Sequence, residues 1–457
     1  MTVIPPLSKP IVLSTFFLVA LILFTPLIHQ PATKAELLHQ AAESESAGEL
    51  NEAIAKYSLV IQRDSKCHAA FYKRATIHQS LGNLEEALKD YSSAISLYQY
   101  DSYYYEDRGR LHLEMENYAC AIADFTDAIK ISPFTEDNYG LRILAYENSG
   151  NNRAALAECT ACINLFPAYY LPYLERSMLF DDLGSPEKAW NDIQKAIELH
   201  PSNFVSYRQR AWLRFHKEDY VNAINDMNIA ISLKPKNSAS YMSRAAFNRV
   251  NCNYLAALAD YRQALEIEPN NSFIFESIGL TQFYFGDYKK AIQSYDKALV
   301  LDPSNTSALI SRADVYAALG NYSKALVDYN SCIRRDPKNS NAYQNRGMLF
   351  ENCGDDLKAS QDYDKAIHIS KKSLTAFRFR AQLRMKQGNR EGARADFKTV
   401  LNFEPVNYSF MNALDRAIAH FNLGNIAEAK KDLEKALKLY PGCKEATQLK
   451  NKIESQS

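Results

Sequence analysis

Apolar and polar positions follow helical spacing along this chain, in pairs of short segments separated by turn residues. Residues 272–305 show one such pair, with Phe275 and Gly279 one turn apart on the first segment and Gly286 at the turn. The second segment carries, in order, Ala291, Tyr295, Ala298 and Pro303. Since side chains three or four apart share one face of a helix, the pattern predicts two amphipathic helices joined by a tight turn.

This pair of predicted helices recurs with a period of 34 residues. Alanine occupies the same place in the second helix at 53, 87, 121, 155, 189, 223, 257, 291, 325, 359 and 393, and again at 429. Proline follows the second helix at 133, 167, 201, 235, 269, 303 and 337, and later at 405 and 441. A fixed period of this length indicates a repeat array, in which each unit buries its apolar face only by stacking on its neighbours.

The order of residue types in a unit is a large aromatic, a small residue, Gly-x-Tyr, Ala, an aromatic, Ala and Pro. This order resembles the tetratricopeptide repeat (TPR) family, over residues 34–443, about nine-tenths of the chain. The resemblance implies an all-α fold, namely a right-handed superhelical solenoid of about twelve helix-turn-helix repeats. It also implies a concave groove, lined by the first helices, that holds an extended peptide or a partner helix.

The period sets the expected boundaries of the array. The predicted repeats are 34–67, 68–101, 102–135, 136–169, 170–203, 204–237, 238–271, 272–305, 306–339, 340–373, 374–407 and 410–443, with Tyr408 and Ser409 inserted before the last. In the remainder, 444–457, Ala446, Leu449 and Ile453 share one helical face. We therefore expect a capping helix and a short tail after the last repeat.

The amino terminus has a different composition. Residues 1–10 form a polar, proline-containing tail, 11–28 an uncharged apolar run of eighteen residues, and 29–33 a linker. At about 1.5 Å per residue a helix of this length reaches about 27 Å, which matches the hydrocarbon core of a bilayer. Two interpretations stay open: a transmembrane signal anchor, or a signal peptide cleaved near Thr33-Lys34-Ala35, where small residues occupy the two cleavage positions.

The charges beside the apolar run give a weak orientation. Lys9 and the α-amino group precede it, and Lys34 is the nearest positive charge after it. This difference favours a single-pass membrane protein with its repeats on the non-cytoplasmic side. The alternative is a secreted or periplasmic protein after signal cleavage. The eight scattered cysteines favour a reducing compartment instead.

Composition argues against several classes of function. Fifty-three basic residues balance fifty-three acidic ones, so the chain lacks the net positive charge typical of nucleic-acid binding. No Gly-rich phosphate loop, His-Glu-x-x-His or Gly-x-Ser-x-Gly motif is present, and we expect no enzyme activity, no cofactor and no metal site. Cys159 and Cys162 form a Cys-x-x-Cys pair, but both fall in core positions, so we interpret them as packed free thiols.

A charged pair recurs within the repeats. Ten units place an arginine before the small residue of the first helix and an acid before the second-helix aromatic, as in Arg244 with Asp260 and Arg312 with Asp328. The two units that lack the arginine also lack the acid: they carry Gln40 with Lys56, and Ile278 with Ser294. Because both partners are lost together, we interpret the pair as a structural ion pair between the two helices. The alternative, an arginine ladder for phosphate, would not require a matched acid.

The middle of the array supplies the candidate partner-binding residues. Aromatic, methionine and arginine side chains, which binding hot spots favour, occupy groove positions there: Arg208, Trp212, Phe215, Met242, Arg249, Phe273 and Phe283. The alternative is that several of them pack between neighbouring first helices. The lysines and asparagines with which chaperone-binding members of the family clamp a terminal carboxylate are absent from corresponding positions such as Tyr72, Glu106 and Gly140.

The sequence therefore predicts a membrane-tethered, non-enzymatic scaffold. Its expected partners are a protein or peptide in the groove and a membrane at the amino-terminal helix, with no nucleic acid. Two alternatives remain: a receptor or co-chaperone for protein import or export, and a regulatory subunit of an enzyme complex.

Overall fold

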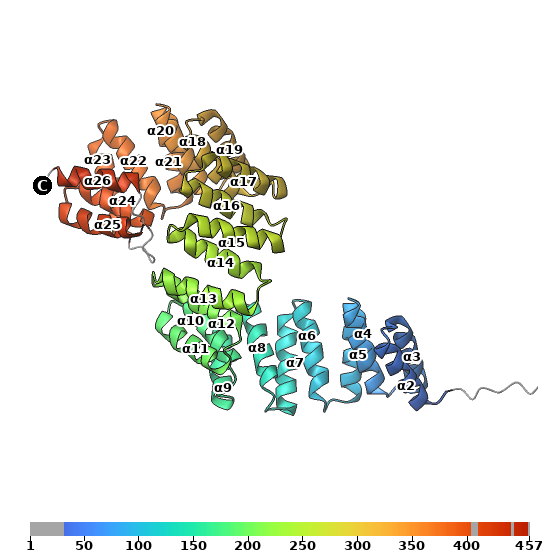
Figure 1. Ribbon diagram of the computed structural model, residues 1–457. Helices are drawn as coiled ribbons and strands as arrows, with labels where there is room; N and C mark the ends of the chain where they lie inside the picture. The colour runs from blue at the N-terminus through green and yellow to red at the C-terminus, as the bar shows by residue number, and fades with distance from the viewer. Residues whose placement is uncertain (1–31, 404–409, 440–442, 456–457) are drawn as a thin grey trace, which may run out of the picture. The chain divides into compact units, whose positions relative to one another are not determined.

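The computed structural model describes residues 32–403, 410–439 and 443–455. The predicted tail at 1–10 and apolar run at 11–28 lie outside the described residues. Within the described ranges every regular element is an α-helix, α2 to α26, and no strand occurs (Figure 1). None of the described helices is both long enough and apolar enough to cross a membrane.

The helices form the twelve expected pairs, followed by one more helix. The first helices are α2 (Lys34–Ser46), α4 (His68–Ser80), α6 (Ser102–Glu114), α8 (Glu136–Asn148), α10 (Leu171–Asp182), α12 (Phe204–His216), α14 (Ser238–Val250), α16 (Ser272–Phe285), α18 (Thr306–Ala318), α20 (Ser340–Asn352), α22 (Leu374–Lys386) and α24 (Phe410–Asn422). The second helices are α3 (Leu50–Arg63), α5 (Leu84–Leu97), α7 (Tyr118–Ile131), α9 (Asn152–Leu165), α11 (Pro186–Leu199), α13 (Tyr220–Leu233), α15 (Tyr254–Ile267), α17 (Tyr288–Leu301), α19 (Tyr322–Arg335), α21 (Asp356–Ile369), α23 (Arg390–Asn402) and α25 (Ile426–Leu439). The last is α26 (Lys444–Glu454). The predicted all-α repeat architecture is thereby confirmed.

The chain divides into two compact units within α12. The first unit ends at Gln209 and the second begins at Arg210. Within each unit, helices contact their pair partners, and the second helix of a pair contacts the first helix of the next pair, as α15 contacts α16. This nearest-neighbour packing is the defining property of a solenoid.

The turn between paired helices depends on local chemistry. Gly286 ends α16 in the left-handed region, at φ 89°, where a residue with a Cβ would be strained. Asp287 then begins α17, and its side chain accepts a hydrogen bond of 3.2 Å from the backbone N–H of Lys290. The Gly-Asp pair therefore ends one helix and caps the next.

The aromatic and small positions of the pattern meet in the core. Ala291, Tyr295 and Ala298 are fully buried. The Tyr295 ring lies so close to α16 that a Cβ on Gly279 would come within 2.8 Å of its Cε1 atom. The small residue is needed because the ring occupies the space beside it.

Two smaller expectations also agree with the structure. Cys159 and Cys162 are buried free thiols, and burial raises the pKa of Cys162 to about 12. Helix α26 buries Ala446, Leu449 and Ile453 against the last pair, as expected of a capping helix.

The arginine that recurs in the repeats forms a bidentate ion pair with the acidic residue of the second helix. Arg244 donates from Nε and Nη2 to the two carboxylate oxygens of Asp260, over 3.0 and 2.5 Å. Arg312 does the same to Asp328, with both bonds at 2.8 Å. These bonds raise the pKa of the Arg312 guanidinium, against the opposing effect of its burial.

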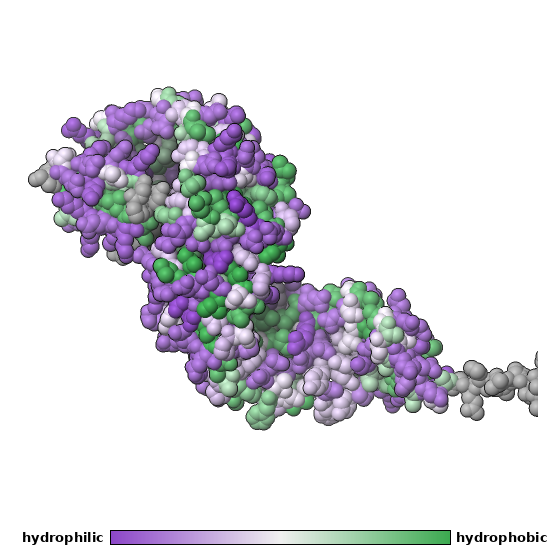
Figure 2. All heavy atoms as spheres, viewed as in Figure 1, coloured by the Kyte–Doolittle hydropathy of each residue, from purple (hydrophilic) through white to green (hydrophobic). Residues whose placement is uncertain are grey.

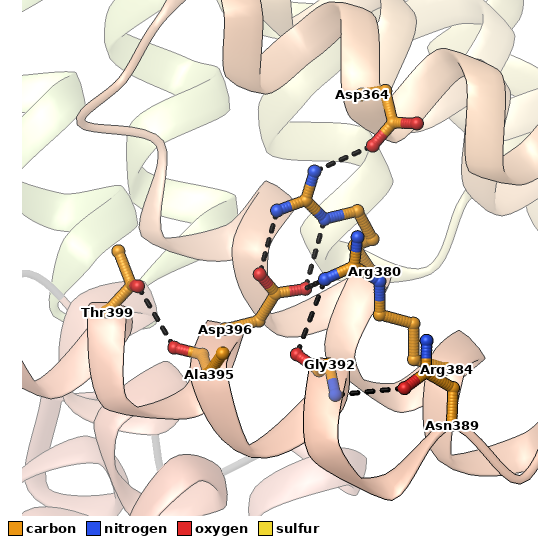
Figure 3. Close-up of polar contacts among 8 residues, drawn as sticks. All are labelled: Asp364, Arg380, Arg384, Asn389, Gly392, Ala395, Asp396 and Thr399. Atoms are coloured by element: carbon orange, nitrogen blue, oxygen red, sulfur yellow. Dashed lines mark hydrogen bonds and ion pairs between the residues drawn. The ribbon is translucent and has the colours of Figure 1, made fainter.

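The same arginine also reaches the preceding repeat. Nη1 of Arg244 donates to Asn228 over 2.7 Å, and Nη1 of Arg312 to Asp296 over 2.6 Å. Figure 3 shows the arrangement at Arg380, which joins Asp396 of its own pair to Asp364 of the pair before. The same hydrogen bond from Nη1 to a side chain of the preceding repeat is made by Arg74, Arg108, Arg142, Arg176 and Arg346. One guanidinium therefore ties three helices together.

The two pairs without the arginine use neutral or single-charge substitutes. Lys56 donates to Ser44 over 2.8 Å in the first pair, and Ser294 donates to Gln282 over 2.8 Å in the eighth. The polar contact between paired helices is retained there, but the link to the preceding repeat is not made by these residues.

We predict that Arg244→Ala lowers the free energy of unfolding by about 3 kcal/mol, because it leaves the nearly buried Asp260 carboxylate without its cation. The measurement is the melting temperature by circular dichroism. Arg262→Ala is the matched control, since it removes an exposed arginine from α15, and we expect a change within about 0.5 kcal/mol. Equal melting of the two variants would show that the pair does not hold the repeat.

Candidate functional site

Two adjoining cavities lie along the first helices of the second unit. Their volumes are about 540 and 420 Å³. They share Asp314, Gln344, Asn345, Thr375 and Met411, from α18, α20, α22 and α24. Because they share walls, we treat them as one surface feature, which we call the groove.

The groove has a polar part and an apolar part. Side-chain amides and hydroxyls line the larger cavity: Thr306, Ser307, Ser311, Asn339, Asn341, Gln344, Asn345, Ser373, Thr375 and Asn412. Phe283, Met348, Phe379 and Met411 lie in the wall of the smaller one. An amide side chain both donates and accepts hydrogen bonds, which is what a peptide main chain requires of its partner.

Asp314 lines both cavities. It accepts hydrogen bonds from the Tyr329 hydroxyl and from the Asn345 amide, the latter over 3.0 Å. Burial raises the pKa of Asp314 to about 6, although the two hydrogen bonds act in the opposite direction. In the described part of the chain it forms no ion pair, so its carboxylate has donors but no cation.

Arg378 is the buried cation beside the groove. Its side chain is inaccessible to solvent and lies 2.6 Å from both Asp415 of α24 and Glu445 of α26. Thr375 donates to the second oxygen of Asp415, over 2.6 Å. Among the residues that the structure describes, Nη2 of Arg378 has no hydrogen-bond partner. The capping helix thus supplies a carboxylate to the end of the groove as well as covering the last repeat.

Three of the predicted binding residues take part in packing between helices. Trp212 and Phe215 of α12 lie against the fully buried Phe247 of α14, with ring centroids 4.9 and 4.5 Å apart. Met242 packs on the core cluster that contains Ile274. This is the alternative that the sequence left open for these positions.

The other four predicted binding residues differ in burial and in surroundings. Arg208, in the first unit, and Arg249, in the second, are half-buried, and Nε of each lacks a hydrogen-bond partner among the described residues. Phe273 is 56% exposed at the start of α16. Phe283 lines the smaller cavity. The other five candidates of the second unit line neither of these two cavities.

Sequence reasoning missed the residues that shape the groove, above all Asp314, Asn345 and Arg378. A signal existed in the repeat alignment. Asp314 occupies the first-helix position that holds Trp212, Ala246 and Leu280 in the three preceding repeats. An acid where the three preceding repeats carry apolar residues is the kind of departure that points to a site.

The first unit contains a half-buried carboxyl pair, Glu147 of α8 and Glu175 of α10. Burial and the nearby Glu175 raise the pKa of Glu147 to about 8, and burial also raises the pKa of Glu175. Two carboxyls that are desolvated together cannot both ionise cheaply, so the pair retains a proton at neutral pH.

Other kinds of site find less support. No group of three or more His, Cys, Asp and Glu side chains within the described ranges is placed to hold a metal ion. On the face shown in Figure 2, hydrophobic side chains occur in small groups among hydrophilic ones.

Comparison with family models gives matches along much of the chain. A model described as TPR repeat matches residues 279–320, and models described as Tetratricopeptide repeat match 68–101, 306–339, 340–373 and 413–443. A model described as Anaphase-promoting complex subunit 5 matches 98–149 and 146–203. Curated proteins give no match.

Several solved structures match part or most of this chain. Yeast Tom70 is 17% identical, with 92% of this chain and 95% of that chain covered and a TM-score of 0.49. A tetratricopeptide repeat protein from Parabacteroides merdae is 21% identical, with 56% and 98% covered and a TM-score of 0.47. The Cut9–Hcn1 hetero-tetramer of the APC/C is 12% identical, with 93% of this chain and 90% of that chain covered and a TM-score of 0.44. At these identities and scores the likeness does not extend to function.

We predict that Glu147→Gln stabilises the protein increasingly as pH rises from about 5 to about 8. The raised pKa of Glu147 means that the folded state keeps a proton that the unfolded state releases above its ordinary pKa, so wild-type stability falls over this range. Because glutamine does not ionise, the variant lacks the part of this pH dependence of stability that comes from Glu147. Melting temperatures of both proteins across the range provide the measurement. The exposed Glu86→Gln is the control, and a difference from wild type that is constant with pH would contradict the prediction.

Proposed function

We propose that this chain, which belongs to the tetratricopeptide repeat family, is a non-enzymatic scaffold that binds a peptide segment of a partner protein in the groove of its second unit. The observation that carries the proposal is the pair of adjoining cavities with shared amide-bearing walls. They extend over residues from five successive first helices, α16 to α24, and from α26.

The chemistry of the groove suits an extended segment. A peptide presents one N–H and one C=O per residue, and Gln344 and Asn345 supply both donors and acceptors. Phe283, Met348 and Met411 provide apolar surface for side chains. An array of rigid helix pairs holds these groups in place before binding, which lowers the entropy cost of association.

The charged groups of the groove are tied to structural partners rather than arranged for catalysis. Asp314 is held by Tyr329 and Asn345, and Arg378 by Asp415 and Glu445. This is why we propose binding without chemical transformation.

The proposal includes attachment to a membrane, with the repeats on the non-cytoplasmic side. Its support is the sequence alone: an apolar run of eighteen residues at 11–28 with Lys9 before it. Such an anchor would place the scaffold, and whatever it binds, at a membrane surface.

To test the groove, peptides that bind the full chain are selected from a displayed library of random sequences. We expect these peptides to bind the variant that combines Gln344→Ala and Asn345→Ala at least tenfold more weakly than they bind the wild-type protein. The loss follows from removing main-chain partners. The matched control combines Gln361→Ala and Asn451→Ala, two exposed amides outside the groove, and should bind as wild type does. Equal binding by both double variants, each checked for folding by circular dichroism, would place the site elsewhere.

For membrane attachment, we expect the full chain expressed in cells to stay in the membrane fraction after alkaline carbonate washing, and a chain lacking residues 1–28 to be released. Protease added to sealed vesicles that retain the native orientation should leave the repeats protected. Full release of the intact chain by carbonate would contradict a spanning anchor, and a mature amino terminus near Ala35 would favour the signal-peptide interpretation.

A further inference from the structure

We infer that the segment which the groove binds is basic, with a lysine or arginine side chain placed against Asp314 and a main-chain carbonyl facing Arg378. The inference rests on the proposed function and specifies the chemistry of the partner. It depends on the balance of charge in the groove and on two groups whose pairing is incomplete, the partly buried Asp314 and the buried Arg378.

The carboxylates of the groove outnumber its available cations. Asp314 lines both cavities and, within the described ranges, forms no ion pair. Glu276 stands beside the larger cavity, where it accepts from Asn305 over 2.8 Å and from the lining residue Ser307 over 2.5 Å. It too has donors but no cationic partner in the part of the chain that the structure describes.

The cations near the groove do not offset these carboxylates. Arg378 lies between Asp415 and Glu445, so this cluster carries one positive and two negative charges. Lys372, which lines the larger cavity, is exposed to solvent. A cationic side chain entering the groove would therefore meet a net negative potential, and desolvated charges attract more strongly than exposed ones.

Arg378 adds a requirement of a different kind. Its Nη2 group is buried and has no acceptor among the described residues, although the side chain lines the smaller cavity. A buried N–H without an acceptor is costly, and a carbonyl oxygen is the neutral acceptor that every peptide residue offers. Because Asp415 and Glu445 already neutralise the guanidinium, a carboxylate from the partner would be repelled where a carbonyl is not.

The apolar wall fits the stem of a basic side chain. Phe283, Met348 and Phe379 line the same cavity as Asp314. Lysine and arginine bury their methylene groups along apolar surface while the charged end reaches a polar group. The wall therefore favours a long basic residue over a small polar one.

The test uses three fluorescein-labelled libraries of nine-residue peptides that are identical except at the central position, which is Lys or Arg, Ala, or Asp or Glu. Binding to the full chain is measured by fluorescence anisotropy. We expect the basic library to bind at least tenfold more tightly than the acidic one. Combining Asp314→Asn with Glu276→Gln should remove that preference.

The control for charge combines Glu391→Gln with Glu266→Gln, which removes two exposed carboxylates from second helices of the same unit. It should keep the preference for basic peptides. A preference that survives in the Asp314 and Glu276 variant, or that favours the neutral or acidic library, would overturn the inference while leaving peptide binding intact. Binding of no library, or binding that the Gln344 and Asn345 variant leaves unchanged, would instead remove the groove as the binding site.

Discussion

In most repeats one guanidinium group connects three helices of the array. Arg380 shows the principle: two of its nitrogens hold Asp396 on the next helix, and the third holds Asp364 on the helix before (Figure 3). Apolar contacts between alanine and aromatic side chains are compatible with small shifts of one helix along another. A bidentate arginine–carboxylate contact allows much smaller shifts, because both hydrogen bonds require the same relative orientation of the two groups. We interpret the pair as the element that fixes the register of the repeats rather than as a large source of net stability.

Regular packing of this kind leaves the exposed positions of the first helices free to vary. In the second unit those positions form the groove, which includes Asp314 and Arg378. The cost of burying them is carried locally, by Tyr329 for Asp314 and by Asp415 for Arg378. Helix α26 then serves two purposes, since Ala446, Leu449 and Ile453 cover the last pair while Glu445 reaches back to Arg378. The end of the array and the end of the groove are therefore made by the same helix.

The candidate strip of aromatics and arginines illustrates what residue type alone leaves open. Trp212 and Phe215 have the composition of a binding hot spot, yet both rings rest on the buried Phe247 of the following pair. A large aromatic at a first-helix position serves equally well to fill the space between neighbouring repeats. Distinguishing the two roles requires the distance between adjacent first helices, which the spacing of residues along one helix does not contain.

The sequence by itself determined the helix pairs, their period and the pairing of each arginine with its acid, because these depend on contacts within one repeat and recur in nearly every copy. It also determined the Gly-Asp turn at 286–287 and the capping helix, since each depends on a local pattern of residues. Tertiary structure alone decided the reach of each arginine to the preceding repeat, the place of Asp314 against Tyr329 and Asn345, and the contact of Arg378 with Glu445, 67 residues away. The Asp314–Asn345 and Arg378–Glu445 contacts each join different repeats at a single place in the chain, so a periodic pattern carries no record of them. The contact of the arginine with the preceding repeat does recur, but it depends on how neighbouring repeats stack, which the spacing of residues within one repeat does not contain.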